Sequence, residues 1–195
     1  FLNRQRQAEA EAVAAATPAV DPALLVRPHS PSFGPEDAPV TLVEFFDPSC
    51  EACRAFFPVV KQILADNPKN VRLVLRYVLF HEGSETAARI LETARKQGVF
   101  EPVLEALMVA QPQWHSDPQV LKAWEAAEAA GIDVEKARAE MMAADITETL
   151  KRDSQDAQAA GVRQTPTFFV NGKPLLSFGA QPLNDLVKAE VEQSK

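Results

Sequence analysis

Cysteine is scarce in this chain, because only Cys50 and Cys53 occur among its 195 residues. So low a count excludes a scaffold held by several disulfides and a zinc site built from four cysteines. A disulfide across two intervening residues would close a very short loop, which restricts the unfolded chain little. The pair is therefore a poor structural staple, and a chemical role explains it better.

Other features are missing as well. No apolar run approaches the roughly 18 residues of a membrane span, and no internal repeat of 20–50 residues is present. The net charge is −7, which argues against non-specific binding to nucleic acid. The chain begins at Phe1 without a signal-peptide pattern, so removal of an upstream targeting or anchoring segment stays open.

One stretch organises the rest of the chain. Val40–Phe46 is apolar and predicts a central strand, Asp47-Pro48-Ser49 predicts a turn, and the apolar period of residues 55–64 predicts a helix. Cys-x-x-Cys opens that helix, whose N-terminus favours an anion such as a thiolate. We therefore expect Cys50 to have a lowered pKa and to attack, and Cys53, one turn on, to resolve the mixed disulfide.

The first 39 residues differ from the remainder. Residues 1–16 are rich in helix-forming residues, but a lone helix of this length is marginal in water. We expect either a helix that packs on another chain or a short tether. Residues 17–39 contain six prolines, which predict an extended linker that holds this segment away, with residues 24–26 as a candidate edge strand.

The pattern after the dithiol predicts an α/β fold. A second strand is expected over residues 71–80, parallel to the first across a helix that Pro58 should kink. Residues 84–160 predict five helices, one of them broken at Gln111-Pro112. Strands are expected at residues 167–170 and 175–178 around Asn171-Gly172, followed by a helix over residues 182–193.

Two segments carry a resemblance to a known family: residues 44–53, EFFDPSCEAC, and residues 165–172, TPTFFVNG. With this order of elements, the chain resembles the thioredoxin superfamily, and the helical block resembles the insertion of its DsbA-like branch. That branch comprises thiol–disulfide oxidoreductases of the bacterial cell envelope. The resemblance implies a thioredoxin fold from residues 40–83 and 161–195, with a helical insertion at 84–160.

The resemblance also implies roles for residues away from the cysteines. Glu44 stands where the family carries a buried acid beneath the dithiol, and burial would raise its pKa and suit proton exchange with Cys53. A structural Glu44 paired with Arg76 is the alternative, and both can hold. Pro166 is expected to be cis and to lie against the sulfurs, with the Thr165 hydroxyl close by.

The residues between the cysteines should tune the reduction potential. Glu51 brings a negative charge next to Cys50, which opposes thiolate formation, and Ala52 adds no hydrogen bond. We therefore expect a milder oxidant than DsbA itself. His29, His81 and His115 show no ligand spacing with the cysteines, so surface or capping roles are expected for them.

The leading hypothesis is a periplasmic oxidase or isomerase of protein disulfides, with no cofactor beyond the redox pair itself. The partners implied are cysteine-containing proteins and a membrane redox protein, with a homo-oligomer through residues 1–16 as a further expectation. A module that holds Cu(I) between the two thiolates is the alternative. A Cys–His hydrolase is disfavoured, because the second cysteine would quench the nucleophile by oxidation.

Overall fold

The structure, a computed structural model, describes residues 2–195 and divides into two compact units. The first unit contains Phe1–Phe45, Pro58–Arg76 and Asp156–Lys195, and the second contains Phe46–Phe57 and Tyr77–Gln155. Phe1, which the sequence analysis included in the N-terminal helix, lies outside the described residues. The dithiol belongs to the second unit, together with the helices that follow the second long strand.

Mixed α/β structure is confirmed. The strands are β1 (Ser32–Phe33), β2 (Val40–Phe46), β3 (Val71–Tyr77), β4 (Thr167–Val170) and β5 (Lys173–Pro174). The helices are α1 (Leu2–Ala16), α2 (Pro22–Leu25), α3 (Glu51–Asp66), α4 (Ser84–Lys96), α5 (Phe100–Trp114), α6 (Leu121–Ala129), α7 (Val134–Glu140), α8 (Ala144–Ala159) and α9 (Ala180–Gln193). Among these described helices, none is both long and apolar enough to cross a membrane.

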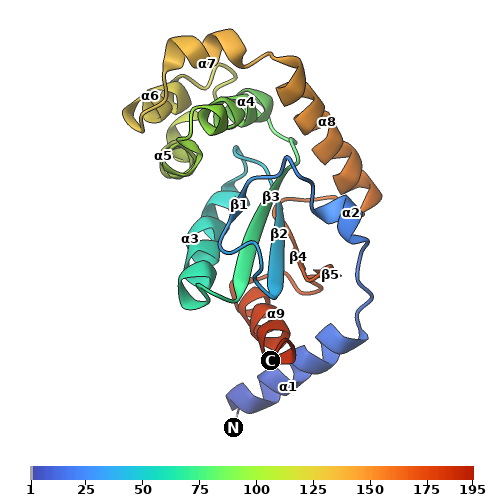
Figure 1. Cartoon of the computed structure of the whole chain (residues 1–195). Helices are drawn as coiled ribbons and strands as arrows, with labels where there is room; N and C mark the ends of the chain where they lie inside the picture. The colour runs from blue at the N-terminus through green and yellow to red at the C-terminus, as the bar shows by residue number, and fades with distance from the viewer. Residues whose placement is uncertain (1) are drawn as a thin grey trace. The chain divides into compact units, whose positions relative to one another are not determined.

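The strands form one sheet in the order β1-β3-β2-β4-β5 (Figure 1). The Val40 N–H bonds the Asn70 carbonyl at one end of the β2–β3 pair, and the Val78 N–H bonds the Phe46 carbonyl at the other. The first bond joins the starts of β2 and β3 and the second joins their ends, so the two strands are parallel, as predicted. The remaining pairs are antiparallel. β2 lies in the centre and is buried almost throughout, which explains its continuous apolar sequence.

The segment before β2 is packed, which contradicts the prediction of an extended linker. The expected edge strand at residues 24–26 is wrong, because α2 forms there with Asp21 as its N-cap and Pro22 at its first position. Ser32–Phe33 forms the edge strand instead and pairs with β3. Leu25 is 2% exposed, so this segment contributes to the core of the first unit.

α1 is not held away from the fold, which corrects a second expectation. It packs against α9 in the same unit (Figure 1). Ala14 is fully buried, and Arg6 forms an ion pair with Asp185 of α9 at 3.1 Å. One part of the surface of this short helix is thus covered within its own chain, whereas Leu2 and Val13 stay exposed.

The hairpin after β4 is tighter than predicted. Asn171 and Gly172 both have positive φ, as a two-residue turn requires, so the return strand begins directly at Lys173. The expected strand at residues 175–178 is therefore displaced to Lys173–Pro174. Leu176 and Phe178, which the expected strand contained, lie outside β5 and are largely exposed.

The second unit contains α4 to α7 and most of α8, and α4, α5, α6 and α7 pack on one another. The predicted break at Gln111-Pro112 is wrong, because α5 continues to Trp114. Trp114 is fully buried and its indole N–H donates to the Leu107 carbonyl at 2.9 Å. This anchoring compensates for the single backbone hydrogen bond that Pro112 removes.

Candidate active site

The dithiol opens α3 as predicted. The Asp47 carbonyl accepts the Cys50 N–H at 3.0 Å, and the Cys50 carbonyl accepts the Arg54 N–H at 3.1 Å. Cys50 therefore stands at the N-cap, where helix N–H groups and the helix dipole favour negative charge. Its exposed fraction is 7%, against 0% for Cys53. Of the two cysteines, Cys50 is therefore the one with some surface exposed to solvent.

Cys53 lies in the first turn of α3 and contacts the end of β2. The Asp47 N–H donates to Cys53 Sγ at 3.4 Å. An N–H directed at sulfur favours the thiolate over the thiol. This bond therefore helps Cys53 to act as an attacking or leaving group although it is buried.

The Asp47 carboxylate lies at the centre of this network, and the sequence analysis gave it no role. It is fully buried. Oδ1 accepts the Ser49 N–H at 2.9 Å and the Ser84 hydroxyl at 2.6 Å, and Oδ2 accepts the N–H groups of Phe80 at 2.8 Å and His81 at 3.2 Å. One carboxylate thus joins the dithiol turn, the loop after β3 and the start of α4. The bond to Ser49, two residues on, is an Asx turn, a local signal that the sequence offered.

His81 lies at the surface, as expected, but its ring also contacts the buried carboxylate beside the dithiol turn, which was not expected. Its Nδ1 lies 2.7 Å from Oδ2 of Asp47, and 47% of its side chain is exposed. The bond to Asp47 raises the pKa of His81 above 6.5, partial burial opposes this, and the negative charges of Asp47, Cys50 and Glu51 raise it further. The sequence separation of 34 residues hid this pairing.

Gln111 of α5 also holds the dithiol turn, and it was missed for the same reason. Its side-chain amide donates to the Pro48 carbonyl at 2.6 Å and to the Cys50 carbonyl at 2.9 Å. Gln111 is fully buried. Two carbonyls next to the nucleophile therefore depend on a side chain from the helical insertion.

The residues between the cysteines lie at the rim of the site. Glu51 is exposed, and its Oε1 lies 3.5 Å from Nε2 of His115, another histidine that was expected to stand apart. When His115 is protonated, it partly neutralises Glu51. Ala52 is half-buried.

The other predicted site residues belong to the first unit. Glu44 is 5% exposed and lies on β2 opposite Phe168 of β4. The Thr165–Pro166 peptide bond is cis, as predicted, and it directly precedes β4. Pro166 is buried and Thr165 is half-buried. The roles implied for Glu44, Thr165 and Pro166 in the exchange stay predictions.

Arg76 is fully buried in the first unit and lies in a charged cluster. It donates to Asp156 at 2.7 Å and to the carbonyls of Leu24 and Leu25 at 2.9 Å each. Arg27 also donates to Asp156, at 2.8 Å. Burial alone would raise the pKa of Asp156, but the two guanidinium groups outweigh it and lower that pKa below 3.8. Arg76 thus anchors α2, which gives it a structural role besides the tuning role expected of it.

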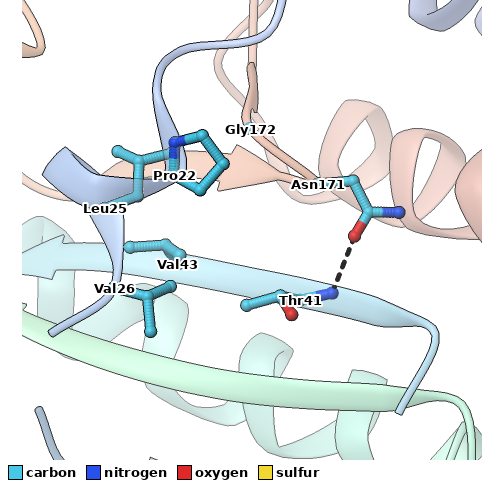
Figure 2. Close-up of a pocket in the computed structure, with 7 residues that line it drawn as sticks. All are labelled: Pro22, Leu25, Val26, Thr41, Val43, Asn171 and Gly172. Atoms are coloured by element: carbon cyan, nitrogen blue, oxygen red, sulfur yellow. Dashed lines mark hydrogen bonds between the residues drawn. The ribbon is translucent and has the colours of Figure 1, made fainter. Parts of the chain in front are cut away.

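A cavity of about 270 Å³ lies in the first unit, between α2 and β2 (Figure 2). Its lining is mostly apolar. The dashed line marks the hydrogen bond that the Thr41 N–H donates to the Asn171 side-chain oxygen at 2.9 Å. No titratable side chain lines it: the residues are Pro22, Leu25, Val26, Thr41, Val43, Asn171 and Gly172. Elsewhere, no three His, Cys, Asp or Glu side chains within residues 2–195 gather closely enough to hold a metal ion.

Comparisons with known proteins agree with this geometry. A family model described as Thioredoxin matches residues 27–188. The chain is 34% identical to the Na(+)/H(+) antiporter NhaA of Herminiimonas arsenicoxydans over 80% of its own length but only 25% of that protein. It thus spans about a quarter of the length of this curated relative. It is 26% identical to the "Probable disulfide bond formation protein D" of Bacillus anthracis over 72% of this chain and 69% of that one.

Solved structures show the same likeness. A thioredoxin-like oxidoreductase from Silicibacter pomeroyi shares 32% identity, with a TM-score of 0.74 over 87% of this chain and 96% of that one. Wolbachia pipientis alpha-DsbA1 shares the fold at 18% identity, with a TM-score of 0.72 over 89% and 96% of the two chains. The thioredoxin fold expected from the sequence is confirmed.

Proposed function

Because the chain belongs to the thioredoxin family, we propose that it is a thiol–disulfide oxidoreductase of the DsbA-like branch, acting on cysteine-containing proteins. The observation that carries the proposal is the placement of Cys50 at the N-cap of α3, with Cys53 buried one turn on. Disulfide exchange requires a first sulfur whose thiolate is stabilised and a second sulfur close by, and the less buried cysteine at the helix N-cap with Cys53 behind it fits this requirement.

The exchange proceeds in two balanced steps. The Cys50 thiolate attacks one sulfur of a substrate disulfide, so that a mixed disulfide forms and the other substrate sulfur leaves as a thiolate. Cys53, as a thiolate, then attacks Cys50, and the second substrate sulfur leaves. Two electrons pass from the dithiol to the substrate. In the oxidising direction, a substrate thiolate attacks Cys50 of the Cys50–Cys53 disulfide and the same steps run backwards.

We propose an oxidase or isomerase role in the bacterial periplasm, with a membrane redox protein that resets the dithiol. Self-association through residues 1–16 stays a proposal, although the packing of α1 on α9 removes one reason for it. Light scattering of the full chain and of a chain starting at Thr17, which lacks α1 but keeps the packed segment around α2, tests it. Equal monomeric masses would overturn the oligomer.

The proposed activity is tested by oxidation of a reduced multi-cysteine protein, repair of a scrambled one, and reduction of insulin. Cys50→Ser should abolish all three. Cys53→Ser should accumulate mixed disulfides, and His29→Asn, a change in the first unit, should keep full activity. Turnover that survives Cys50→Ser would overturn the mechanism.

The Cu(I) alternative rests on the same two thiolates and needs a separate experiment. The reduced chain is titrated with Cu(I) in competition with a chelator of known affinity. Retention of one Cu(I) per chain, without activity in the three exchange assays, would favour the metal-binding module.

A further inference from the structure

One buried carboxylate holds both the dithiol and His81. The main chain of Asp47 contacts the two cysteines, through its carbonyl to the Cys50 N–H and through its N–H to Cys53 Sγ. Its side chain contacts His81 twice, at the backbone N–H and at Nδ1. The imidazole is therefore fixed relative to the sulfurs by bonds to a single residue.

The groups that act on His81 come from two elements. Asp47 lies directly after β2, and Cys50 and Glu51 open α3. His115, the C-cap of α5, lies next to Glu51, with 3.5 Å between its Nε2 and the Glu51 Oε1. Asp47 already accepts four donors other than the imidazole. Asp47 remains the direct partner of the imidazole, but its single charge is shared among several donors, and the Cys50 charge adds a second attraction for an imidazolium at position 81.

We propose that His81 is the charge partner of Cys50: in the reduced protein its imidazolium balances the Cys50 thiolate, and the reduction potential depends on pH through it. This inference rests on the proposed disulfide exchange and adds a residue to it. His81 acts through its charge and through Asp47, so its role is electrostatic and positioning. It forms no bond to substrate.

The proton balance of the exchange follows. When a substrate dithiol reduces the Cys50–Cys53 disulfide, two electrons and two protons leave the substrate. The electrons end on the two sulfurs. One proton ends on Cys53 as a thiol, and the other ends on His81, while Cys50 remains a thiolate. When the enzyme disulfide forms again, His81 releases its proton as the Cys50 charge disappears.

The coupling between protonation of His81 and ionisation of Cys50 is reciprocal, so it can be measured at either residue. A negative charge at Cys50 favours the protonated imidazole, which agrees with the direction of the His81 pKa. By linkage, the imidazolium must favour the Cys50 thiolate by the same free energy. A thiolate stabilised in this way stabilises the reduced state and makes the protein a stronger oxidant.

His81→Asn is the variant of choice. The asparagine amide can donate to Asp47 from near the position of Nδ1, so the anchor is kept while the charge is lost. We expect the equilibrium with glutathione below neutral pH to shift roughly three- to tenfold toward the oxidised protein, about 15–30 mV at 29.6 mV per tenfold. The difference from the wild type should vanish at high pH, where His81 is neutral. His29→Asn should change nothing.

Titration of the His81 ring by NMR gives a readout that does not need turnover. Its pKa should be higher in the reduced chain than in Cys50→Ser, because serine carries no charge. An equal His81 pKa in both chains, or a potential difference that persists unchanged at high pH, would overturn the proposal. Absence of exchange by the wild type would overturn the proposed function instead, and the ring titration would still report on the charge pairing.

Discussion

Two buried aspartates, one in each compact unit, are neutralised in opposite ways. Asp156 in the first unit accepts from Arg27 and Arg76, whose guanidinium groups keep their charge at any ordinary pH. Asp47 in the second unit accepts from N–H groups, a hydroxyl and His81, whose charge changes near neutrality. The first cluster fixes structure whatever the pH. The second can change its charge next to the reactive sulfur.

The Asp156 cluster, whose two guanidinium charges are permanent, should contribute more to the free energy of unfolding than the Asp47 cluster does. Arg76→Met leaves the Asp156 carboxylate with one guanidinium and two α2 carbonyls without their donor, so we expect a loss of about 3–5 kcal/mol in the free energy of unfolding. Urea denaturation measures it. Arg72→Met on the same strand is the matched control, because Arg72 forms only a 3.3 Å bond to Ser32, and it should cost less than about 1 kcal/mol. Equal losses of unfolding free energy in Arg76→Met and Arg72→Met would refute a special structural role for Arg76.

Asp47→Asn should destabilise the fold less than Arg76→Met does, but it should also change the reactivity of Cys50. The new amide brings a donor into a site where five donor groups converge on the carboxylate, and we expect a loss of about 2–3 kcal/mol. It should also slow alkylation of Cys50, because the turn that sets the N-cap loosens. Ser84→Ala removes one of these bonds and should cost about 1 kcal/mol. An unchanged rate of alkylation in a folded Asp47→Asn chain would mean that Asp47 does not affect the reactivity of Cys50.

The two clusters should lose stabilisation at opposite ends of the pH scale. The pKa of Asp156 is lowered, so its contribution is complete above about 3.8 and is lost as pH falls through the folded pKa. The pKa of His81 is raised, so its contribution is complete below about 6.5 and is lost as pH rises through the folded pKa.

Urea denaturation of the wild type and His81→Asn at pH 5.5 and pH 8.5 tests the His81 window. The difference between them should be present at the lower pH and absent at the higher, and it should stay under about 1 kcal/mol because the side chain is half exposed. A difference that grows with pH would reverse the assigned sign.

Glu51 should have the smallest effect. It is exposed, and His115 lies next to it, so water, salt and an imidazole all weaken its influence on Cys50. We expect Glu51→Gln to lower the Cys50 pKa slightly and to leave stability unchanged. Alkylation rates followed from pH 4 to pH 9 measure the shift. A shift in the Cys50 pKa larger than the one caused by His81→Asn would mean that Glu51 influences the sulfur more strongly than His81 does.

The sequence was sufficient wherever a local pattern determines structure. The apolar run of β2, the N-cap position of Cys50 and the Asn171-Gly172 turn each follow from a few neighbouring residues. Asp21-Pro22 is a local helix-start signal as well, but the six prolines of residues 17–39 led to the expectation of an extended linker.

The rest of the site depends on contacts between distant residues. His81 meets Asp47 across 34 positions, and Gln111 meets the dithiol turn across more than 60. No periodicity encodes such pairs. Buried polar side chains take whatever partner the fold provides, so the sequence showed which residues are polar and not which ones meet.

The central claim is that Cys50, and not Cys53, is the reactive thiolate. The rate of alkylation by iodoacetamide should be followed against pH in Cys53→Ser and in Cys50→Ser, each of which keeps one sulfur. We predict that the chain retaining Cys50 reacts well below the free-thiol value of about 8.5, and that the chain retaining Cys53 stays slow until far higher pH. Equal profiles, or faster reaction of Cys53, would contradict this account.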